Sequence, residues 1–115
     1  MKSLVPILLL ALTLTACQSS SDEPKITAIV GAKLIDGKGS TPIDHSIVLI
    51  QGKTIVKVGS QALVPLPKDA EVVDGLNQTV EPATQGTTID AGNPANLVLK
   101  SDSKTRTMKD GQWQN

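Results

Sequence analysis

The sequence predicts an all-β domain, a small β-sandwich or pseudo-barrel of short strands, preceded by a signal-peptide helix. Three observations predict it. The chain has no Phe or Tyr and a single Trp, Trp113, so its core must be built from Ile, Val, Leu and Ala, and frequent β-branched residues favour strands. Apolar and polar residues alternate in a short segment near the start of the domain. Turn-forming residues separate the short segments at close spacing, which is typical of a sandwich or a small barrel.

The first predicted strand covers residues 26–34, because apolar residues recur there at every second position. This alternation places Ile26, Ala28, Val30, Ala32 and Leu34 on one buried face. Further strands are predicted at 46–50, 54–58, 71–74, 78–81, 96–100, 105–109 and 112–113. The segment 46–50 is apolar throughout, which indicates a buried strand.

Turn residues set the predicted connections. Gly52 supplies the positive φ that a tight hairpin needs, and Gly59 is expected to end the strand that follows it. Residues 60–70 contain two prolines and are predicted to form a surface loop. Asp110-Gly111 is a hairpin signal. We expect no helix after the first segment of the chain.

Length and charge limit the function classes. A chain of 115 residues corresponds to one modest domain. Lys plus Arg and Asp plus Glu both number 11, so no charge excess points to a nucleic-acid partner. The missing aromatic residues also argue against a platform on which bases or sugars could stack.

Residues 1–16 are predicted to be a lipoprotein signal peptide. Lys2 precedes a short apolar run that is too short for a comfortable membrane span of about 20 residues. The run ends in Leu14-Thr15-Ala16-Cys17, which resembles the lipobox of bacterial lipoproteins, where small residues expose the bond to the peptidase and the thiol accepts the lipid. Cys17 is the only cysteine, so it has no disulfide partner within the chain. It is the predicted lipidation site, and acyl chains such as palmitate would give stable anchoring.

Residues 17–25 are predicted to be the lipidated cysteine and a flexible tether, and residues 26–115 the domain itself. The tether sequence QSSSDEP is polar and ends in Pro24. The predicted location is the bacterial cell envelope, with the membrane as a partner through the N-terminal lipid. Gln18, in place of Asp, resembles lipoproteins of the outer membrane facing the periplasm, if the host is Gram-negative.

We find no catalytic or metal-ligating set in the sequence. The one histidine, His45, lies between Asp44 and Ser46, but neighbours on an extended strand point to opposite faces and so do not form a triad. We interpret His45 as a partly exposed residue at a strand start. A zinc site needs three or four convergent ligands, and the single Cys is committed to lipid. The sequence therefore predicts that the chain holds no cofactor of its own.

Three weaker motifs are interpreted as ordinary turns. Residues 37–40 (GKGS) lack the spacing and the following helix of a phosphate loop. Asp36 and Asp90 could pair with a substrate, but solvated turn carboxylates explain them more simply. Asn77-Gln78-Thr79 matches a glycosylation sequon by spacing, which has no expected meaning in a bacterial lipoprotein.

The domain resembles the N-terminal and C-terminal segments of metal-dependent amidohydrolases of the imidazolonepropionase-like and Xaa-Pro dipeptidase-like branch. The similar stretches are 31–39, 42–43, 46–50, 52–53, 55–59, 64–67, 70–75 and 79–82, followed by 86–99 and 108–113. In that family, Thr79-Val80-Glu81-Pro82 would continue into a histidine motif that opens a (β/α)₈ barrel of about 250 residues. Here Ala83-Thr84-Gln85-Gly86 follows instead, and Asn96 stands where the family has Asp.

The resemblance implies that the two ends of the family's composite β-sandwich are joined here by a short loop. It carries over no catalytic residue, because the family's metal ligands and acid/base Asp lie on the barrel. A face that the barrel covers in the family would become exposed apolar surface.

Three functions follow as hypotheses. The first is a lipid-anchored, non-catalytic β-domain that acts as a binding or structural module of the cell envelope. The second is an amidohydrolase-type hydrolase of non-peptide C–N bonds, active only as the sandwich subunit of a split enzyme whose barrel is a separate partner protein; zinc or another divalent metal is expected only there. The third is a non-functional truncated relic.

Overall fold

The computed structural model describes residues 25–114 and confirms the predicted all-β class. The predicted signal-peptide helix and most of the tether lie outside the described residues. The strands are β1 (Ile26–Val30), β2 (Lys33–Leu34), β3 (Ser46–Gln51), β4 (Thr54–Ser60), β5 (Glu71–Asp74), β6 (Thr79–Pro82), β7 (Leu97–Lys100), β8 (Thr105–Lys109) and β9 (Gln112–Trp113). No helix among the described residues is long and apolar enough to cross a membrane.

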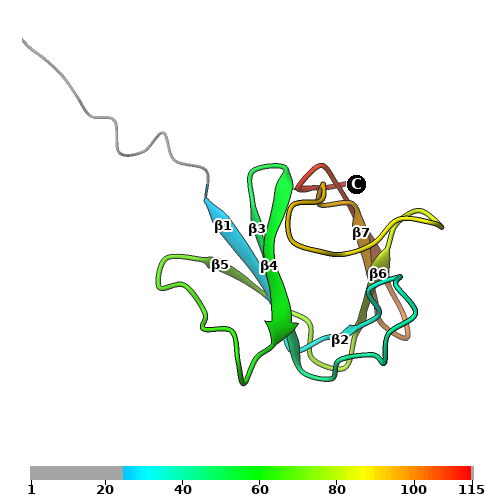
Figure 1. Cartoon of the computed structure of the whole chain (residues 1–115), viewed down its shortest axis with the longest axis horizontal. Helices are drawn as coiled ribbons and strands as arrows, with labels where there is room; N and C mark the ends of the chain where they lie inside the picture. The colour runs from blue at the N-terminus through cyan, green and yellow to red at the C-terminus, as the bar shows by residue number, and fades with distance from the viewer. Residues whose placement is uncertain (1–24, 115) are drawn as a thin grey trace, which may run out of the picture.

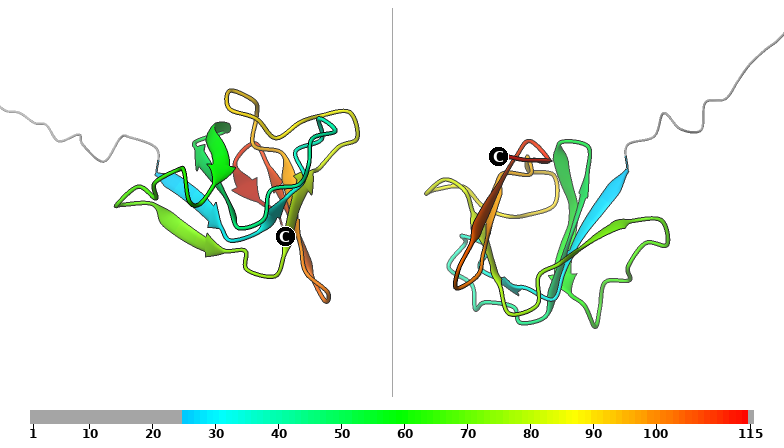
Figure 2. Two further views of the ribbon diagram at one scale, coloured as in Figure 1. Left: turned by 60° about the horizontal axis from the view of Figure 1, so that its bottom comes forward. Right: turned by 180° about the vertical axis from the view of Figure 1, so that it is seen from behind.

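The strands form two mixed sheets (Figure 1). The first sheet has the order β4-β3-β1-β5, and the second has the order β2-β6-β7-β8-β9. The pairs β1–β5 and β2–β6 are parallel, and the other pairs are antiparallel. Figure 2 shows the same two sheets from below and from behind, and the chain passes between them at the β1–β2, β2–β3 and β5–β6 connections.

The single strand predicted at 26–34 is wrong. Gly31 has a φ of 94°, a left-handed conformation that interrupts the extended backbone. The residues before it form β1 in the first sheet, and the residues after it form β2 in the second. The Gly31 N–H donates to the Ser46 carbonyl at 2.8 Å, which holds the corner in place. The alternation of apolar and polar residues therefore continues from β1 into β2, although these strands belong to different sheets.

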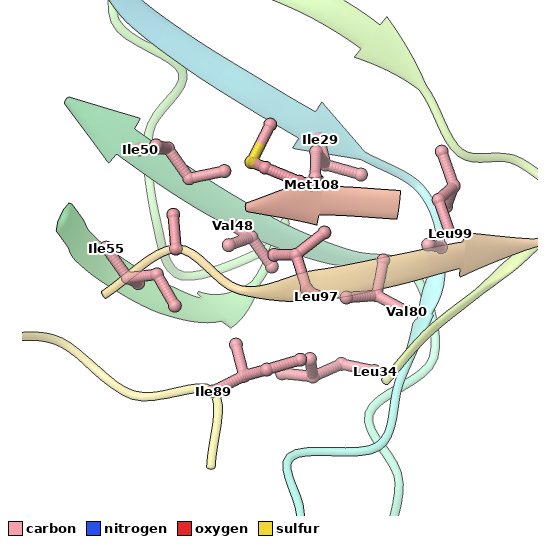
Figure 3. Packing of buried hydrophobic residues seen from close by; sticks show 12 residues of the cluster. Ile29, Leu34, Val48, Ile50, Ile55, Val80, Ile89, Leu97, Leu99 and Met108 are labelled. Carbon is pink, nitrogen blue, oxygen red and sulfur yellow. The ribbon is translucent and has the colours of Figure 1, made fainter. Parts of the chain in front are cut away.

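The main core lies between the two sheets (Figure 3). Its buried members come from both sheets and from the segment that precedes β7: Ile29, Ala32, Leu34, Val48, Ile50, Ile55, Val80, Ile89, Ala95, Leu97, Leu99 and Met108. The core is aliphatic apart from one methionine sulfur, as the composition requires. Trp113 is half-buried and packs against the edge of this cluster.

A smaller apolar cluster lies on the outer face of the first sheet. It consists of Ala28, Ile47, Leu49 and Val64, and Val64 comes from the segment that connects β4 to β5. Successive residues of β1 and β3 therefore enter different clusters: Ala28 lies outside and Ile29 inside. This double burial explains the unbroken apolar run of β3, and it corrects the expectation that only one face of 26–34 would be buried.

The hairpin signals are confirmed, with one adjustment. Gly52 has a φ of 62°, and Asp110 and Gly111 have φ values of 48° and 82°, the positive pair that a tight two-residue hairpin needs. Gly59, however, does not end β4, because it pairs with Ile47 and the strand continues to Ser60. A Cβ on Gly59 would lie 2.9 Å from a methyl carbon of Val64, so this glycine makes room for the residue that covers the outer face.

Candidate functional site

The predicted lipidation site, Cys17, and the lipobox residues Leu14, Thr15 and Ala16 lie outside the described residues. Within residues 25–114, no group of three or more His, Cys, Asp or Glu side chains is placed to hold a metal ion. The remaining candidates are therefore the polar residues around His45, the loop at Asp36 and Asp90, and the loop that follows β6.

Asp44, His45 and Ser46 do not form a catalytic triad, as the sequence indicated. Ser46 is fully buried, and its Oγ donates to the Ala32 carbonyl at 2.8 Å. His45 is exposed at the residue before β3, as predicted, with a φ of 50°. Its carbonyl accepts the N–H of Gln61 at 2.9 Å. The hydroxyl of Ser46 is thus occupied by the backbone and is not available to His45.

His45 instead lines a polar hollow of about 340 Å³, near the lower end of the range for small-molecule sites. The turns that precede β3 and β6 and the β1–β2 corner meet there. The lining residues are Gly31, Lys33, Asp44, His45, Leu76, Asn77, Gln78 and Thr79. Backbone hydrogen bonds fix the shape of the hollow. The Gly31 N–H donates to the Ser46 carbonyl at 2.8 Å, and the Lys33 N–H donates to the Gln78 carbonyl at 2.9 Å.

Two of the three non-glycine residues with positive φ in the described chain, His45 and Asn77, line this hollow. A side chain in this conformation costs free energy that glycine would avoid, and such residues gather at functional sites. Lys33 and Asp44 carry opposite charges there, yet they form no ion pair within the described residues. The hollow therefore presents an ammonium, a carboxylate, an imidazole and amide groups to solvent. This set can bind a small polar molecule.

A second polar cluster joins two loops at the other end of the core. The Lys38 ammonium lies 2.9 Å from the Asp90 carboxylate, and the Lys38 N–H donates to the Asp36 carboxylate at 2.8 Å. The hydrogen bond from Lys38, followed by that from the Ala91 N–H, lowers the pKa of Asp90. The same Asp90 contact raises the pKa of Lys38. Asp36 and Asp90 thus act as turn carboxylates that tie the GKGS loop to the segment before β7.

The connection from β6 to β7 spans residues 83–96, longer than the short loop that was expected, and it begins with a turn at 83–87. The Thr87 N–H and hydroxyl both donate to the Thr84 carbonyl, at 3.2 and 2.6 Å. The Ala83 N–H donates to the Asn96 carbonyl at 3.2 Å, which extends the β6–β7 ladder by one step. Gly37 packs beneath this turn, because a Cβ on it would lie 2.5 Å from the Thr87 carbonyl oxygen. Residues 83–87 therefore pack against the GKGS loop.

The sequence did not identify the residues that join His45 in the hollow. Lys33, Asn77 and Thr79 are distant from His45 along the chain and meet it only because β2 and β6 pair in parallel. One signal was available, since an Asn in a short turn is a common non-glycine residue at positive φ.

No protein-family model and no curated protein matches the chain. Among solved structures, the chain is similar to molinate hydrolase, with 33% identity and a TM-score of 0.47 over 53% of this chain and 13% of that one. It is also similar to phenylurea hydrolase B, with 34% identity and a TM-score of 0.48 over 51% of this chain and 13% of that one. The ochratoxinase of A. niger gives 30% identity and a TM-score of 0.42 over 54% and 14%.

These structural neighbours are amidohydrolase-family proteins, and the likeness is partial in both directions. It covers about half of this chain, and this chain spans about one seventh of the length of those hydrolases.

Proposed function

We propose that the protein is a lipid-anchored, non-catalytic β-domain, related to amidohydrolases, that acts as a binding or structural module of the bacterial cell envelope. The observation that carries this proposal is the connection of β6 to β7 by residues 83–96 alone. Pro82 pairs with Leu97, and the turn at 83–87 is held by its own hydrogen bonds. The two sheets thus enclose a continuous core without an inserted barrel.

The few side chains that could act as metal ligands support a binding role over metal-dependent hydrolysis. The whole sequence has one histidine and one cysteine, and a zinc centre of the usual kind needs three or four convergent ligands. The residues around His45 lack an activated nucleophile, because the neighbouring Ser46 hydroxyl is buried against the Ala32 carbonyl. The polar hollow at Lys33, Asp44, His45 and Asn77 is the part of the domain best suited to a small ligand.

The anchor rests on the lipobox and on Cys17. The expected mature chain begins at that cysteine, carries its acyl chains in the envelope membrane, and reaches the domain through the polar tether. In a Gram-negative host, the expected location is the outer membrane, facing the periplasm.

The test is to purify the protein from its native membranes and measure three quantities on one sample. The mass of the N-terminal peptide should show a lipid on Cys17, and the Cys17→Ser variant should lose it. The zinc content should be well below one ion per chain, and amides should not be hydrolysed above the rate of a buffer blank. Stoichiometric zinc together with amide hydrolysis by the pure chain would overturn the proposal.

A second candidate is the sandwich subunit of a split hydrolase with a separate barrel chain. Exposed apolar side chains on and beside the first sheet favour it, since Leu63, Leu66 and Val72 are 83%, 48% and 52% exposed. An affinity pull-down from native membranes would test this candidate. Recovery of a histidine-rich barrel protein in near-equal amount would support it, and recovery of no such protein would remove it.

A further inference from the structure

The segment between β4 and β5 carries an unusual concentration of exposed apolar side chains. We call Leu63, Leu66 and Val72 the Leu63 patch. Val72 pairs with Ala28, whose side chain belongs to the outer cluster, so Val72 lies on the outer face of the first sheet. Val64 of the same segment is buried in that cluster and fixes the segment over the sheet. The patch is therefore held in place by a packed residue.

The tip of this segment has no charged side chain, and most of its backbone N–H groups are hydrogen-bonded. Residues 61–67 (QALVPLP) carry no charge. The Leu63 and Val64 N–H groups both donate to the Ser60 carbonyl at 2.9 Å, and the Ala62 N–H donates to the Ser60 Oγ at 3.1 Å. The Gln61 N–H is also bonded, and the two prolines have no N–H.

N–H groups that are already hydrogen-bonded lower the free-energy cost of moving a segment toward lipid. Leu66 has the one backbone donor of this stretch for which no such bond is formed.

The segment that carries the Leu63 patch runs from the far end of β1 back to its start, because Ser60 pairs with Ser46, the neighbour of the Ile47 that pairs with Val30. Thr27, near the start of β1, pairs with Glu71, which follows the segment directly. In Figures 1 and 2, the β4–β5 connection and the start of β1 lie on one side, and the loop at 83–87 lies on the opposite side. The start of β1 and the segment that carries the patch therefore both lie away from the 83–87 loop.

The length of the tether brings this side close to the bilayer. Eight residues, 18–25, separate Cys17 from β1. A chain of eight residues reaches at most about 27 Å when fully extended. The longest strand of this sheet, β4, has 7 residues and is about 23 Å long, so the patch beyond its end lies within reach of the surface to which Cys17 would be attached. A tether of this length also makes the contact intramolecular, so that weak intrinsic affinity is sufficient.

We infer that the Leu63 patch is a membrane-contacting surface that inserts Leu63 and Leu66 into the interfacial region of the lipid bilayer that carries the anchor. This inference rests on the proposed lipidation of Cys17. It orients the domain, because the polar 83–87 loop on the opposite side then faces away from the membrane. Lipid, in place of the barrel chain of the second candidate, is the occupant that this inference assigns to the patch.

The test places a reporter tryptophan on each side of the molecule. Leu63→Trp is compared with Gln85→Trp, an exposed position in the opposite loop, and with the unchanged protein, whose only tryptophan is Trp113. Each full lipoprotein is purified from its host and reconstituted in phosphatidylcholine vesicles whose acyl chains are brominated near the headgroup. We expect strong quenching of the Leu63→Trp emission, and quenching of Gln85→Trp no greater than that of the unchanged protein.

Equal quenching at both positions, with the chains still bound to the vesicles, would overturn the membrane contact and leave the lipid anchor intact. Chains that do not stay with the vesicles would overturn both the anchor and this inference. A photo-crosslinker at position 63 should yield lipid adducts in cells. A single protein adduct in its place would overturn the inference in favour of a protein partner.

Discussion

Replacing Gly37 with Ala should destabilise the domain more than the same change at Gly39. Both glycines have positive φ, 86° and 83°, so a Cβ costs both positions a similar backbone strain. Their surroundings differ. A Cβ at Gly37 would lie 2.5 Å from the Thr87 carbonyl oxygen and 2.8 Å from a ring carbon of Pro82, whereas nothing lies within 4 Å of a Cβ at Gly39.

The expected loss of stability is the sum of the backbone strain and the steric clash of the added Cβ. The strain of Ala at positive φ destabilises each variant by about 1 kcal/mol. The clash at Gly37 adds about 1–3 kcal/mol, because the colliding atoms are backbone and a proline ring that cannot rotate away. For a domain of this size, 1 kcal/mol corresponds to a shift of about 4–8 °C in the melting temperature. Gly37→Ala should therefore melt at least several degrees below Gly39→Ala.

The assay is thermal unfolding followed by circular dichroism, repeated in urea for the free energy of unfolding. The comparison tests whether the 36–40 loop and the closing turn at 83–87 are packed together. Equal melting temperatures for the two variants would refute that packing. It would also weaken the argument that this turn completes the sandwich.

Three further changes test the core, a buried hydroxyl and the loop ion pair. Leu97→Ala, at a fully buried position, should cost about 2–5 kcal/mol by urea unfolding, and a loss below 1 kcal/mol would contradict the core described here. Ser46→Ala should cost only about 1 kcal/mol, because the Ala32 carbonyl keeps its bond from the Ser46 N–H at 2.9 Å; a much larger loss would refute this. Lys38→Met should raise the pKa of Asp90 toward its ordinary value, as measured by NMR titration. The pKa of Asp90 is lower in the folded protein than in the unfolded chain. The ionised carboxylate therefore stabilises the fold above about pH 3.8, and this effect is lost as the pH falls through the lowered pKa. An Asp90 titration that Lys38→Met leaves unchanged would contradict the ion pair.

Much of the fold could be predicted from local patterns. The turns at Gly52 and at Asp110-Gly111 are determined by residues that tolerate positive φ, so the hairpins were predictable. The break at Gly31 was missed because the alternation of apolar residues continues across it, although β1 and β2 belong to different sheets. The outer cluster was missed because burial of Ala28 depends on Val64, which reaches it from another loop.

The candidate site was much less predictable than the fold. The sequence indicated correctly that Asp44, His45 and Ser46 would not act together. It could not indicate that Lys33 and Asn77 would join His45, since their proximity depends on the parallel pairing of β2 with β6. The N–H bonds of Leu63 and Val64 were equally hidden, because both depend on the Ser60 carbonyl as acceptor.

Equilibrium unfolding of the mature chain alone tests most directly whether this sandwich is complete without a barrel. Urea unfolding should be followed in parallel by far-ultraviolet circular dichroism and by the fluorescence of Trp113, which packs at the edge of the main core. A complete core predicts one cooperative transition with coincident curves from the two probes. Broad curves that do not coincide, together with binding of a hydrophobic dye before unfolding, would contradict the account and indicate a fragment that needs a partner.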